Sequence, residues 1–329
     1  MRARRLRAVA VAGAVSVGVL GATTLPSRAA GPNPADTMLD RARQALRTHE
    51  FQGTIRLAWL DDAGRHTRMI AVDATGGGLR MADGAVVAAR GRAWLRVGKS
   101  WSAVWTDSHP PRAPSITSKY RVRVGSGPSV LGRPTVAVSI RHDGVTVERL
   151  VFDRAIGIVL RRDRLDGHGH LVERAEFVAL SGVAPRTGEM QTPTAAGAAP
   201  HALRGLPDDA ARTVGDGFVL VGAQRVGEQT QLEYTDGVFD ASVFTREGTM
   251  DWDALPDGGA DVRIDGQRVR RYHTAGDTVL AWQSGGRTLT CVTDGTAADQ
   301  ATIVRTLSGE DDDALTDVAR FVTAPFSWI

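Results

Sequence analysis

Alternation of apolar and polar residues with a period of two is the feature that most constrains how this chain can fold. Apolar side chains occupy every second position in three segments, which are Ile55-Leu57-Trp59, Trp101-Ala103-Trp105 and Tyr120-Val122-Val124. This spacing is typical of strands that bury one face. Turn signals at Asp83-Gly84 and Asp143-Gly144 separate such segments. Because short turns connect antiparallel neighbours, the pattern predicts a meander of antiparallel strands.

The second half of the sequence repeats the strand pattern and then changes to a helical one. Strands are expected around Phe218–Val221, Gln231–Tyr234, Ala241–Thr245, Arg268–His273 and Val279–Gln283. Apolar residues then recur at helical spacing, first at Ile303, Val304 and Leu307 and again from Leu315 to Val322. Another helix is expected at the start of the first half, after Asp36.

Residues 182–205 separate the two halves. This stretch is rich in Gly, Pro, Ala and Thr and has no apolar period, so it is expected to be a linker. A length of 329 residues suits two units of ordinary size. The predicted organisation is a first domain at 36–181, the linker at 182–205 and a second domain at 206–329.

Residues 1–29 have the layout of a secretory signal peptide. Arginines in the first seven residues precede an apolar run from Ala8 to Leu25, and Ser27 and Ala29 suit cleavage after Ala29. The alternative is an uncleaved anchor, because about 18 apolar residues can span a bilayer. Export predicts a periplasmic or cell-envelope location. Cleavage removes five arginines and no acidic residue from a net charge of +3, which leaves −2, so charge does not support a nucleic-acid partner.

The sequence contains no complete catalytic or metal-binding pattern. Six residues separate Gly91 from Gly98, where a phosphate-binding loop needs four. His168 and His170 have the spacing of a shared metal on a strand, but the surrounding aspartate and glycines favour an exposed hairpin tip. Cys291 is the only cysteine and is expected to pack in a strand. We therefore expect no enzyme activity, no metal and no cofactor.

Four tryptophans in the first half are the candidate ligand-binding residues, namely Trp59, Trp94, Trp101 and Trp105. Large amphipathic rings suit contact with lipid chains. Two interpretations remain open, because the rings can line a concave hydrophobic groove or fill an ordinary core.

Short motifs appear in a characteristic order along both halves. In the first half they are Tyr120-Arg121-Val122-Arg123-Val124, Val130-Leu131-Gly132-Arg133-Pro134, Phe152-Asp153, Gly157, Leu160-Arg161, Leu165-Asp166, Gly169 and Glu173. In the second half they are Gly217-Phe218, Tyr234-Thr235-Asp236-Gly237 and Val243-Phe244. Together these two series resemble the MucB/RseB family of regulators of the sigma-E stress response.

The resemblance implies an α+β fold whose first domain is a curved antiparallel half-barrel sheet with helices, like the lipoprotein carriers LolA and LolB. A smaller α+β domain would follow. It also implies a non-catalytic regulator that binds the extracytoplasmic segment of a membrane anti-sigma factor and modulates its proteolysis, with an envelope lipid as the releasing signal. The alternative function is a lipid or lipoprotein carrier of the cell envelope.

Overall fold

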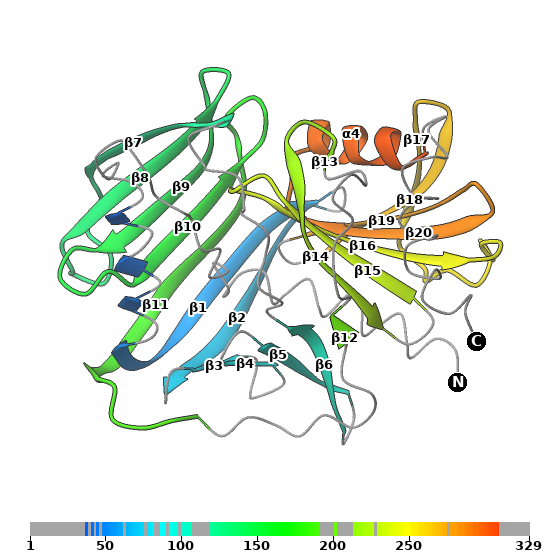
Figure 1. The fold of residues 1–329 in the computed structure, drawn as a ribbon. Helices are drawn as coiled ribbons and strands as arrows, with labels where there is room; N and C mark the ends of the chain where they lie inside the picture. The colour runs from blue at the N-terminus through cyan, green and yellow to red at the C-terminus, as the bar shows by residue number, and fades with distance from the viewer. Residues whose placement is uncertain are drawn as a thin grey trace, which may run out of the picture.

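The computed structural model describes most of the chain between Thr37 and Ser308. The described residues are 37–38, 41–42, 44–45, 48–61, 64–75, 78–81, 86–89, 92–97, 100–106, 119–190, 201–202, 213–226, 229–274 and 277–308. The predicted leader and the predicted helix at Leu315 to Val322 lie outside these residues. Two antiparallel sheets dominate the part that is described (Figure 1).

Eleven strands form the first sheet, in the order β6-β5-β4-β3-β2-β1-β11-β10-β9-β8-β7. Their bounds are β1 (His49–Asp61), β2 (Gly64–Thr75), β3 (Gly78–Met81), β4 (Val86–Ala89), β5 (Arg92–Val97), β6 (Ser100–Thr106), β7 (Arg121–Ser126), β8 (Thr135–His142), β9 (Val145–Asp153), β10 (Val159–Leu165) and β11 (Leu171–Pro185). The sheet is thus two meanders joined where β1 pairs with β11.

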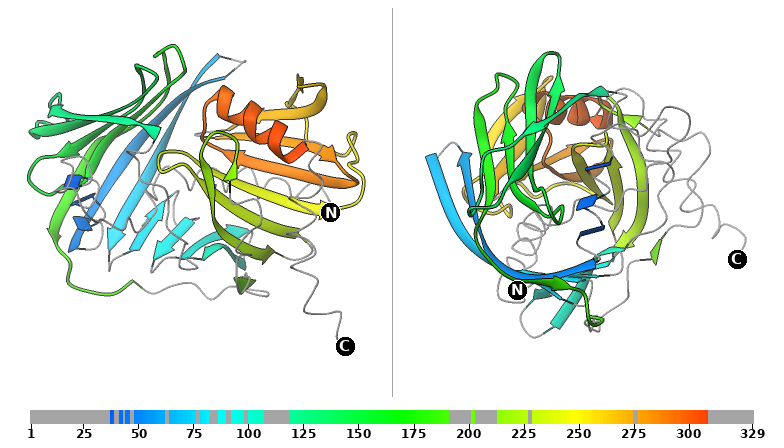
Figure 2. Two further views of the ribbon diagram at one scale, coloured as in Figure 1. Left: turned by 45° about the horizontal axis from the view of Figure 1, so that its top comes forward. Right: turned by 90° about the vertical axis from the view of Figure 1, so that its left-hand side faces the viewer.

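The long strands β1 and β11 bend the first sheet near its middle. Their register shifts twice, once on each side of Gly53, and such β-bulges bend a strand and increase its twist. A Cβ atom at Gly53 would lie 2.6 Å from the carbonyl oxygen of Ala179 and 2.8 Å from the Phe177 ring. The missing side chain therefore allows the close approach of β11. Figure 2 shows the strong curvature of the sheet at these strands.

Helical residues between Thr37 and Thr48 pack against the first sheet. Met38, Ala42 and Ala45 are buried and recur at helical spacing. The guanidinium group of Arg41 donates hydrogen bonds to main-chain carbonyl oxygens in the β9–β10 turn, at 3.2 Å and 3.1 Å. This part of the helix predicted after Asp36 is confirmed.

The second sheet has nine strands, in the order β12-β14-β15-β16-β20-β19-β18-β17, with β13 also paired to β14. Their bounds are β12 (His201–Ala202), β13 (Thr213–Val214), β14 (Phe218–Val226), β15 (Gln229–Thr235), β16 (Asp240–Glu247), β17 (Ala260–Ile264), β18 (Gln267–His273), β19 (Thr278–Ser284) and β20 (Arg287–Thr293). One helix, α4 (Ala297–Ser308), follows it within the described residues. Reciprocal hydrogen bonds between Thr296 and Asp299 form a capping box at the start of α4.

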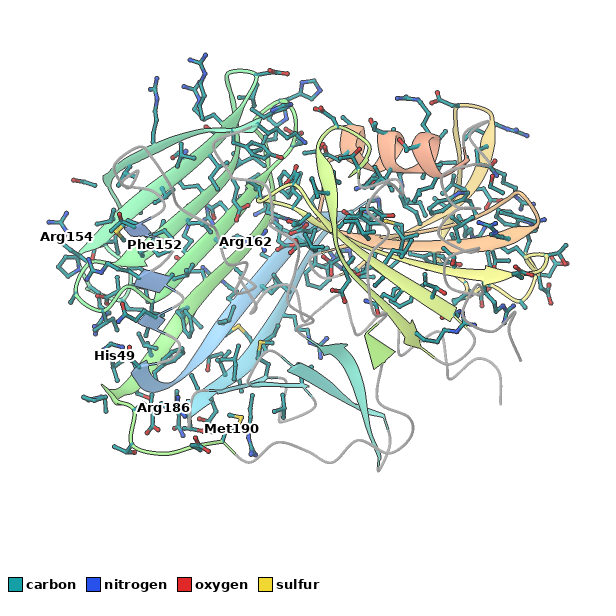
Figure 3. The ribbon with its side chains drawn as sticks, viewed as in Figure 1. His49, Phe152, Arg154, Arg162, Arg186 and Met190 are labelled. Atoms are coloured by element: carbon teal, nitrogen blue, oxygen red, sulfur yellow. The ribbon has the colours of Figure 1, made fainter. Side chains whose placement is uncertain are left out.

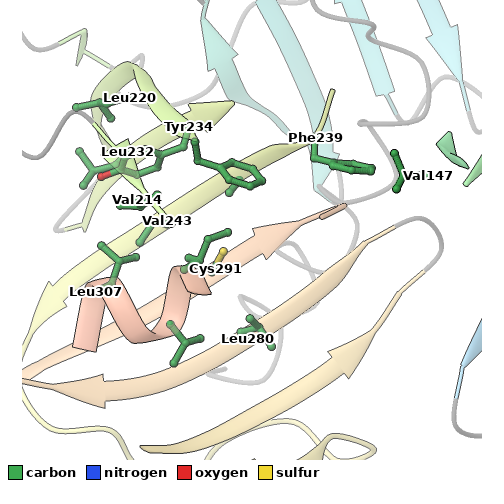
Figure 4. Packing of buried hydrophobic residues seen from close by; sticks show 14 of the residues in the cluster. Val147, Val214, Leu220, Leu232, Tyr234, Phe239, Val243, Leu280, Cys291 and Leu307 are labelled. Atoms are coloured by element: carbon green, nitrogen blue, oxygen red, sulfur yellow. The ribbon is translucent and has the colours of Figure 1, made fainter. Parts of the chain in front are cut away.

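The two sheets share one hydrophobic core. Phe152 from β9 and Phe218 from β14 are fully buried members of the same cluster, which also includes residues of α4. Figure 4 shows Phe239, from the β15–β16 loop of the second sheet, directed towards Val147 on β9. The two sheets are therefore packed together by apolar contacts as well as by the polar contacts described below.

The predicted curved antiparallel sheet, followed by strands and a helix, is confirmed. All five strands predicted in the second half are present, and Ile303, Val304 and Leu307 are buried on α4. Strand β11 continues to Pro185, which includes the first four residues of the predicted linker. The boundaries proposed for the leader, the two domains and the linker remain predictions.

Candidate functional site

Two largely buried arginines on β10, Arg162 and Arg164, connect the first sheet to the second. Arg162 donates to Glu148 Oε1 at 2.7 Å and to Asp294 Oδ2 at 2.9 Å. Arg164 donates to Glu173 Oε2 at 3.0 Å and to the carbonyl oxygen of Asp294 at 2.7 Å. Asp294 follows β20, whereas the other four residues belong to the first sheet. Figure 3 labels Arg162 where the two sheets approach each other. We call these five residues the arginine junction.

Strand register explains how the arginine junction forms. Glu148, Leu150 and Phe152 are two apart on β9, so they share the face that carries the common core. Arg164 pairs directly with Glu148, and Arg162 pairs with Leu150. Cross-strand partners have Cβ atoms about 5 Å apart, which brings the carboxylate and both guanidinium groups together.

Burial makes the arginine junction sensitive to the loss of either charge. The side chains of Arg162, Glu148 and Asp294 are 11%, 3% and 5% exposed. Burial opposes the charge of Arg162, but the carboxylates of Glu148 and Asp294 outweigh it and raise the pKa of Arg162. An arginine removed from this position would leave buried carboxylates without their counter-charge, which is strongly destabilising.

A second polar contact between the sheets lies at Lys119 and Tyr120. The Lys119 ammonium group donates to Asp236 at 2.8 Å and to Asp299 at 3.3 Å. The Tyr120 hydroxyl donates to the same oxygen of Asp236. Burial and the negative charge of Asp236 raise the pKa of Tyr120, so it remains a donor. We call these four residues the lysine junction. Asp236 lies in the β15–β16 loop and Asp299 in the first turn of α4.

Several motif residues make the turns that hold these junctions in place. Asp236 Oδ1 accepts main-chain N–H bonds from Val238 at 3.0 Å and Phe239 at 2.8 Å, which closes the β15–β16 loop. In the β9–β10 turn, Asp153 Oδ1 accepts two main-chain N–H bonds while its other oxygen binds Arg133. These are the local hydrogen bonds for which aspartate is favoured in turns.

Trp59 is the one predicted groove residue whose side chain the structure describes. It is partly buried against the apolar cluster of β1 and β2, and its ring stacks on His66 with centroids 5.1 Å apart. His66 Nε2 lies 2.8 Å from Asp61 Oδ1. Trp59 also pairs across strands with Glu173 of the arginine junction. Trp59 therefore lies near the contact between the sheets.

The other three tryptophans lie on β5 and β6, at the end of the sheet away from β10. Successive backbone pairs connect Phe51 to Ala74, Leu79, Ala88, Ala93 and Trp105. Trp94 lies on the neighbouring row with Val87 and Arg80, and Trp101 pairs with Arg96. The structure thus brings the backbones of Trp94, Trp101 and Trp105 together and places Trp59 several strands away.

His168, His170 and Cys291 have the local settings expected from the sequence. His168 and His170 are in the exposed β10–β11 loop, where Asp166 accepts both of their main-chain N–H bonds. Within the described ranges there is no group of three or more His, Cys, Asp or Glu side chains that could hold a metal ion. Cys291 is fully buried in β20, and burial raises its pKa to about 12. Among the helices that the structure describes, none has the length and apolar character needed to span a bilayer.

Sequence reasoning did not identify the arginine junction. One signal was available, because Glu148 stands two residues before Leu150 and four before Phe152 on a strand with an apolar face. A carboxylate at such a position requires a buried partner. Identifying that partner as Arg162 requires the strand pairing, and Asp294 is 132 residues away from Arg162 in the chain.

The architecture is therefore that of a curved sheet and a second sheet fixed together by buried ion pairs. No protein-family model matches the chain, and the search of curated proteins gives no match. Among solved structures, the chain is similar to a crystal structure of MucB, with 22% identity, a TM-score of 0.49, and coverage of 84% of this chain and 98% of that one.

Two further structures extend this comparison. A MucA/MucB complex from Pseudomonas aeruginosa shows 19% identity and a TM-score of 0.47, covering 82% of this chain and 97% of that one. A LolA-superfamily protein from Nitrosomonas europaea shows 9% identity and a TM-score of 0.21, covering 80% and 93%. Both similarities extend over at least four fifths of this chain.

Proposed function

We propose that this chain is a non-catalytic exported regulator in envelope-stress signalling of the sigma-E type. It acts by binding the extracytoplasmic segment of a membrane anti-sigma factor and modulating proteolysis of that factor. The class of partner follows from the motif resemblance to MucB/RseB proteins, and the site of action follows from the leader at residues 1–29.

The contact between the two motif series is the observation that carries this proposal. Tyr120 begins the series in the first half, and Asp236 belongs to the series in the second half. The Tyr120 hydroxyl donates to the Asp236 carboxylate across the two sheets. Residues from both motif series therefore contact each other in the folded chain. This supports a resemblance to a protein in which the two sheets are packed together in the same way. Two unrelated short matches would not be expected to contact each other.

Affinity capture tests the proposal directly. The chain without residues 1–29 is immobilised and incubated with detergent-solubilised membrane proteins of the source bacterium. We expect the folded chain to capture more of a membrane anti-sigma factor than a control sample of the same chain that has been irreversibly unfolded. Its purified extracytoplasmic segment should then bind the chain in calorimetry and be cleaved more slowly when bound. Capture without any anti-sigma factor, or binding without slower cleavage, would contradict the proposal.

A second candidate function is binding of an envelope lipid by the first sheet. The observation that favours it is the cross-strand row from Phe51 to Trp105, which includes buried Ala74 and Leu79. The other four positions on this row are also apolar, namely Phe51, Ala88, Ala93 and Trp105. Each CH₂ group of an acyl chain removed from water there would contribute roughly 0.8 kcal/mol. Lipid binding by this row is compatible with both a regulator and a carrier.

Fluorescence and thermal unfolding distinguish a lipid groove from an ordinary core. If Trp101 and Trp105 line a groove, adding oleate or a lysophospholipid should shift tryptophan emission and raise the melting temperature. Trp101→Ala and Trp105→Ala should weaken binding without unfolding the protein, whereas Trp252→Ala in the β16–β17 loop should leave binding unchanged. If the rings are core, the same two changes should destabilise by about 3–5 kcal/mol, and lipid should have no effect.

A further inference from the structure

The first sheet ends at β7, whose outer edge is exposed. Five of its six residues are exposed, the exception being Val122, which packs against the common core. Val124 is a large apolar residue with 40% of its surface accessible. Of the strands that the structure describes, only β8 pairs with β7. The main-chain N–H and C=O groups along this edge are therefore available to another strand. We call residues Arg121–Ser126 the β7 edge.

The charge of the β7 edge has one sign. Arg121 and Arg123 alternate with the valines, so they project from the face opposite to the core. Neither has an ion-pair partner within the part of the chain that the structure describes. The neighbouring strand contributes Arg141, which pairs directly with Arg121. Neither β7 nor β8 contains a carboxylate.

The other sheet edges in the described ranges lack this combination. Strand β6 has no charged residue, and β12 has only two residues. On β17, Asp261 already binds Arg268 at 2.9 Å and Arg270 at 3.0 Å. The β7 edge is thus the described edge that combines exposure, length and unpaired positive charge.

A second copy of this chain is a poor occupant for the β7 edge. Pairing of two β7 strands would bring the arginines of both copies onto one face, and like charges on facing strands are destabilising. Arginines on an edge strand thereby oppose self-association. The same side chains attract a strand that carries carboxylates at alternate positions.

We propose that the β7 edge is a docking site for an extended acidic segment of a partner protein, which adds to the first sheet as a further strand. The main chain of about six residues pairs along β7 over roughly 20 Å. Carboxylates at every second residue face Arg121 and Arg123, and small apolar residues between them cover Val124. The proposal rests on the proposed function in that the partner is the anti-sigma factor's extracytoplasmic segment.

Synthetic peptides test this site without knowledge of the partner. The probe is an eight-residue peptide with aspartate and valine in alternation, blocked at both ends, titrated into the full chain and followed by fluorescence anisotropy. We expect saturable binding that weakens with added salt, since the charges are exposed. Arg121→Glu with Arg123→Glu should weaken binding by about tenfold or more. The matched control, Arg65→Glu with Arg68→Glu on exposed positions of β2, should bind like the unchanged chain.

N-methylated peptides separate strand addition from charge attraction alone. One peptide is methylated on the nitrogens of odd residues and another on those of even residues, with charge unchanged. At least one must lose binding if main-chain N–H groups pair with β7. The proposal is overturned if no saturable binding occurs, if both methylated peptides bind like the parent, or if the β7 and β2 variants behave alike.

The purified anti-sigma segment then separates the two proposals. If it binds the unchanged chain and the Arg121/Arg123 variant equally, the β7 edge is not its docking site, whereas the proposed function stands. If the peptides bind at β7 but no anti-sigma segment binds the chain, the docking site stands and the proposed function fails.

Discussion

At the scale of single residues, the lysine junction depends on one buried carboxylate. Asp236 is fully buried and accepts hydrogen bonds from both Lys119 and Tyr120. Tyr120→Phe removes one donor while preserving the ring, so the free energy of unfolding should fall by about 1–3 kcal/mol in urea denaturation. Tyr272→Phe is the matched control, because its hydroxyl donates to the carbonyl of Pro256 near the surface. Equal losses of unfolding free energy for the two changes would show that the Tyr120–Asp236 hydrogen bond stabilises the protein no more than a hydrogen bond near the surface.

Asp163 on β10 supports a prediction of pH dependence. It accepts hydrogen bonds from Arg161 at 2.6 Å and Arg174 at 2.7 Å. Burial acts to raise the pKa of Asp163, but these bonds and the two positive charges outweigh burial and hold the pKa below its usual value. The ionised form therefore stabilises the fold above about pH 4, and this contribution is lost as pH falls through the folded-state pKa.

Urea unfolding of Asp163→Asn at a series of pH values tests this assignment. The variant should be less stable near neutral pH, and its unfolding free energy should fall less than that of the unchanged chain between about pH 5 and pH 2. Asp253→Asn, at an exposed position, should retain the unchanged pH profile. Parallel profiles for the unchanged chain and Asp163→Asn would contradict the predicted role.

At the scale of elements, curvature of the first sheet depends on the close approach of β1 and β11. Gly53→Ala would place a Cβ within 3 Å of the Phe177 ring and the Ala179 carbonyl, so the strands must separate. We expect a loss of about 1–3 kcal/mol in unfolding free energy. Gly125→Ala is a matched strand control, because a Cβ there meets nothing within 4 Å. If Gly53→Ala lowers the unfolding free energy no more than Gly125→Ala does, the sheet accommodates the added methyl group and the close approach is not required.

Local sequence patterns predicted individual strands and helices better than they predicted which strands pair with each other. The alternation at Ile55, Leu57 and Trp59 predicted β1, and the helical spacing at Ile303, Val304 and Leu307 predicted α4. Each depends on neighbours in sequence that share one buried face. The pairing of β1 with β11 joins residues more than 100 positions apart, such as Leu57 and Ala175. That partner choice depends on packing of the whole sheet, which period alone does not specify.

The same limit applies to the candidate site. Tryptophan content predicted a ligand-binding region in the first sheet, but strand order separates Trp59 on β1 from Trp101 and Trp105 on β6. The arginine junction escaped prediction because arginines on a strand are usually solvent-exposed. Only the register of β10 between β9 and β11 brings Arg164 beside both Glu148 and Glu173.

At the scale of the whole molecule, two kinds of contact hold the sheets together. The apolar core is continuous from β9 to β14 and α4, while the arginine and lysine junctions add ion pairs with buried carboxylates. Apolar contact supplies attraction without direction, and buried charges require one relative placement of the sheets. The lysine junction also connects α4 to the first sheet through Asp299.

This arrangement predicts that the two halves remain associated after the chain between them is cut. A specific protease site is placed between Met190 and His201, and the cleaved protein is analysed by gel filtration at neutral pH. We expect the two fragments to elute together because they share the core and both junctions.

Replacing the two largely buried arginines of β10 should then weaken the association of the fragments. Arg162→Met with Arg164→Met keeps much of the side-chain volume but leaves Glu148, Glu173 and Asp294 without these cations. Removing one partner of a buried pair costs about 3–5 kcal/mol, which corresponds to at least a hundredfold loss of fragment affinity. Arg263→Met with Arg268→Met, remote from the first sheet in strand order, should leave the fragments together. Separation of the fragments in the unchanged protein would show that the core and the junctions do not hold the two halves together. Equal fragment affinity in the two variants would show that the arginine junction does not contribute to the association.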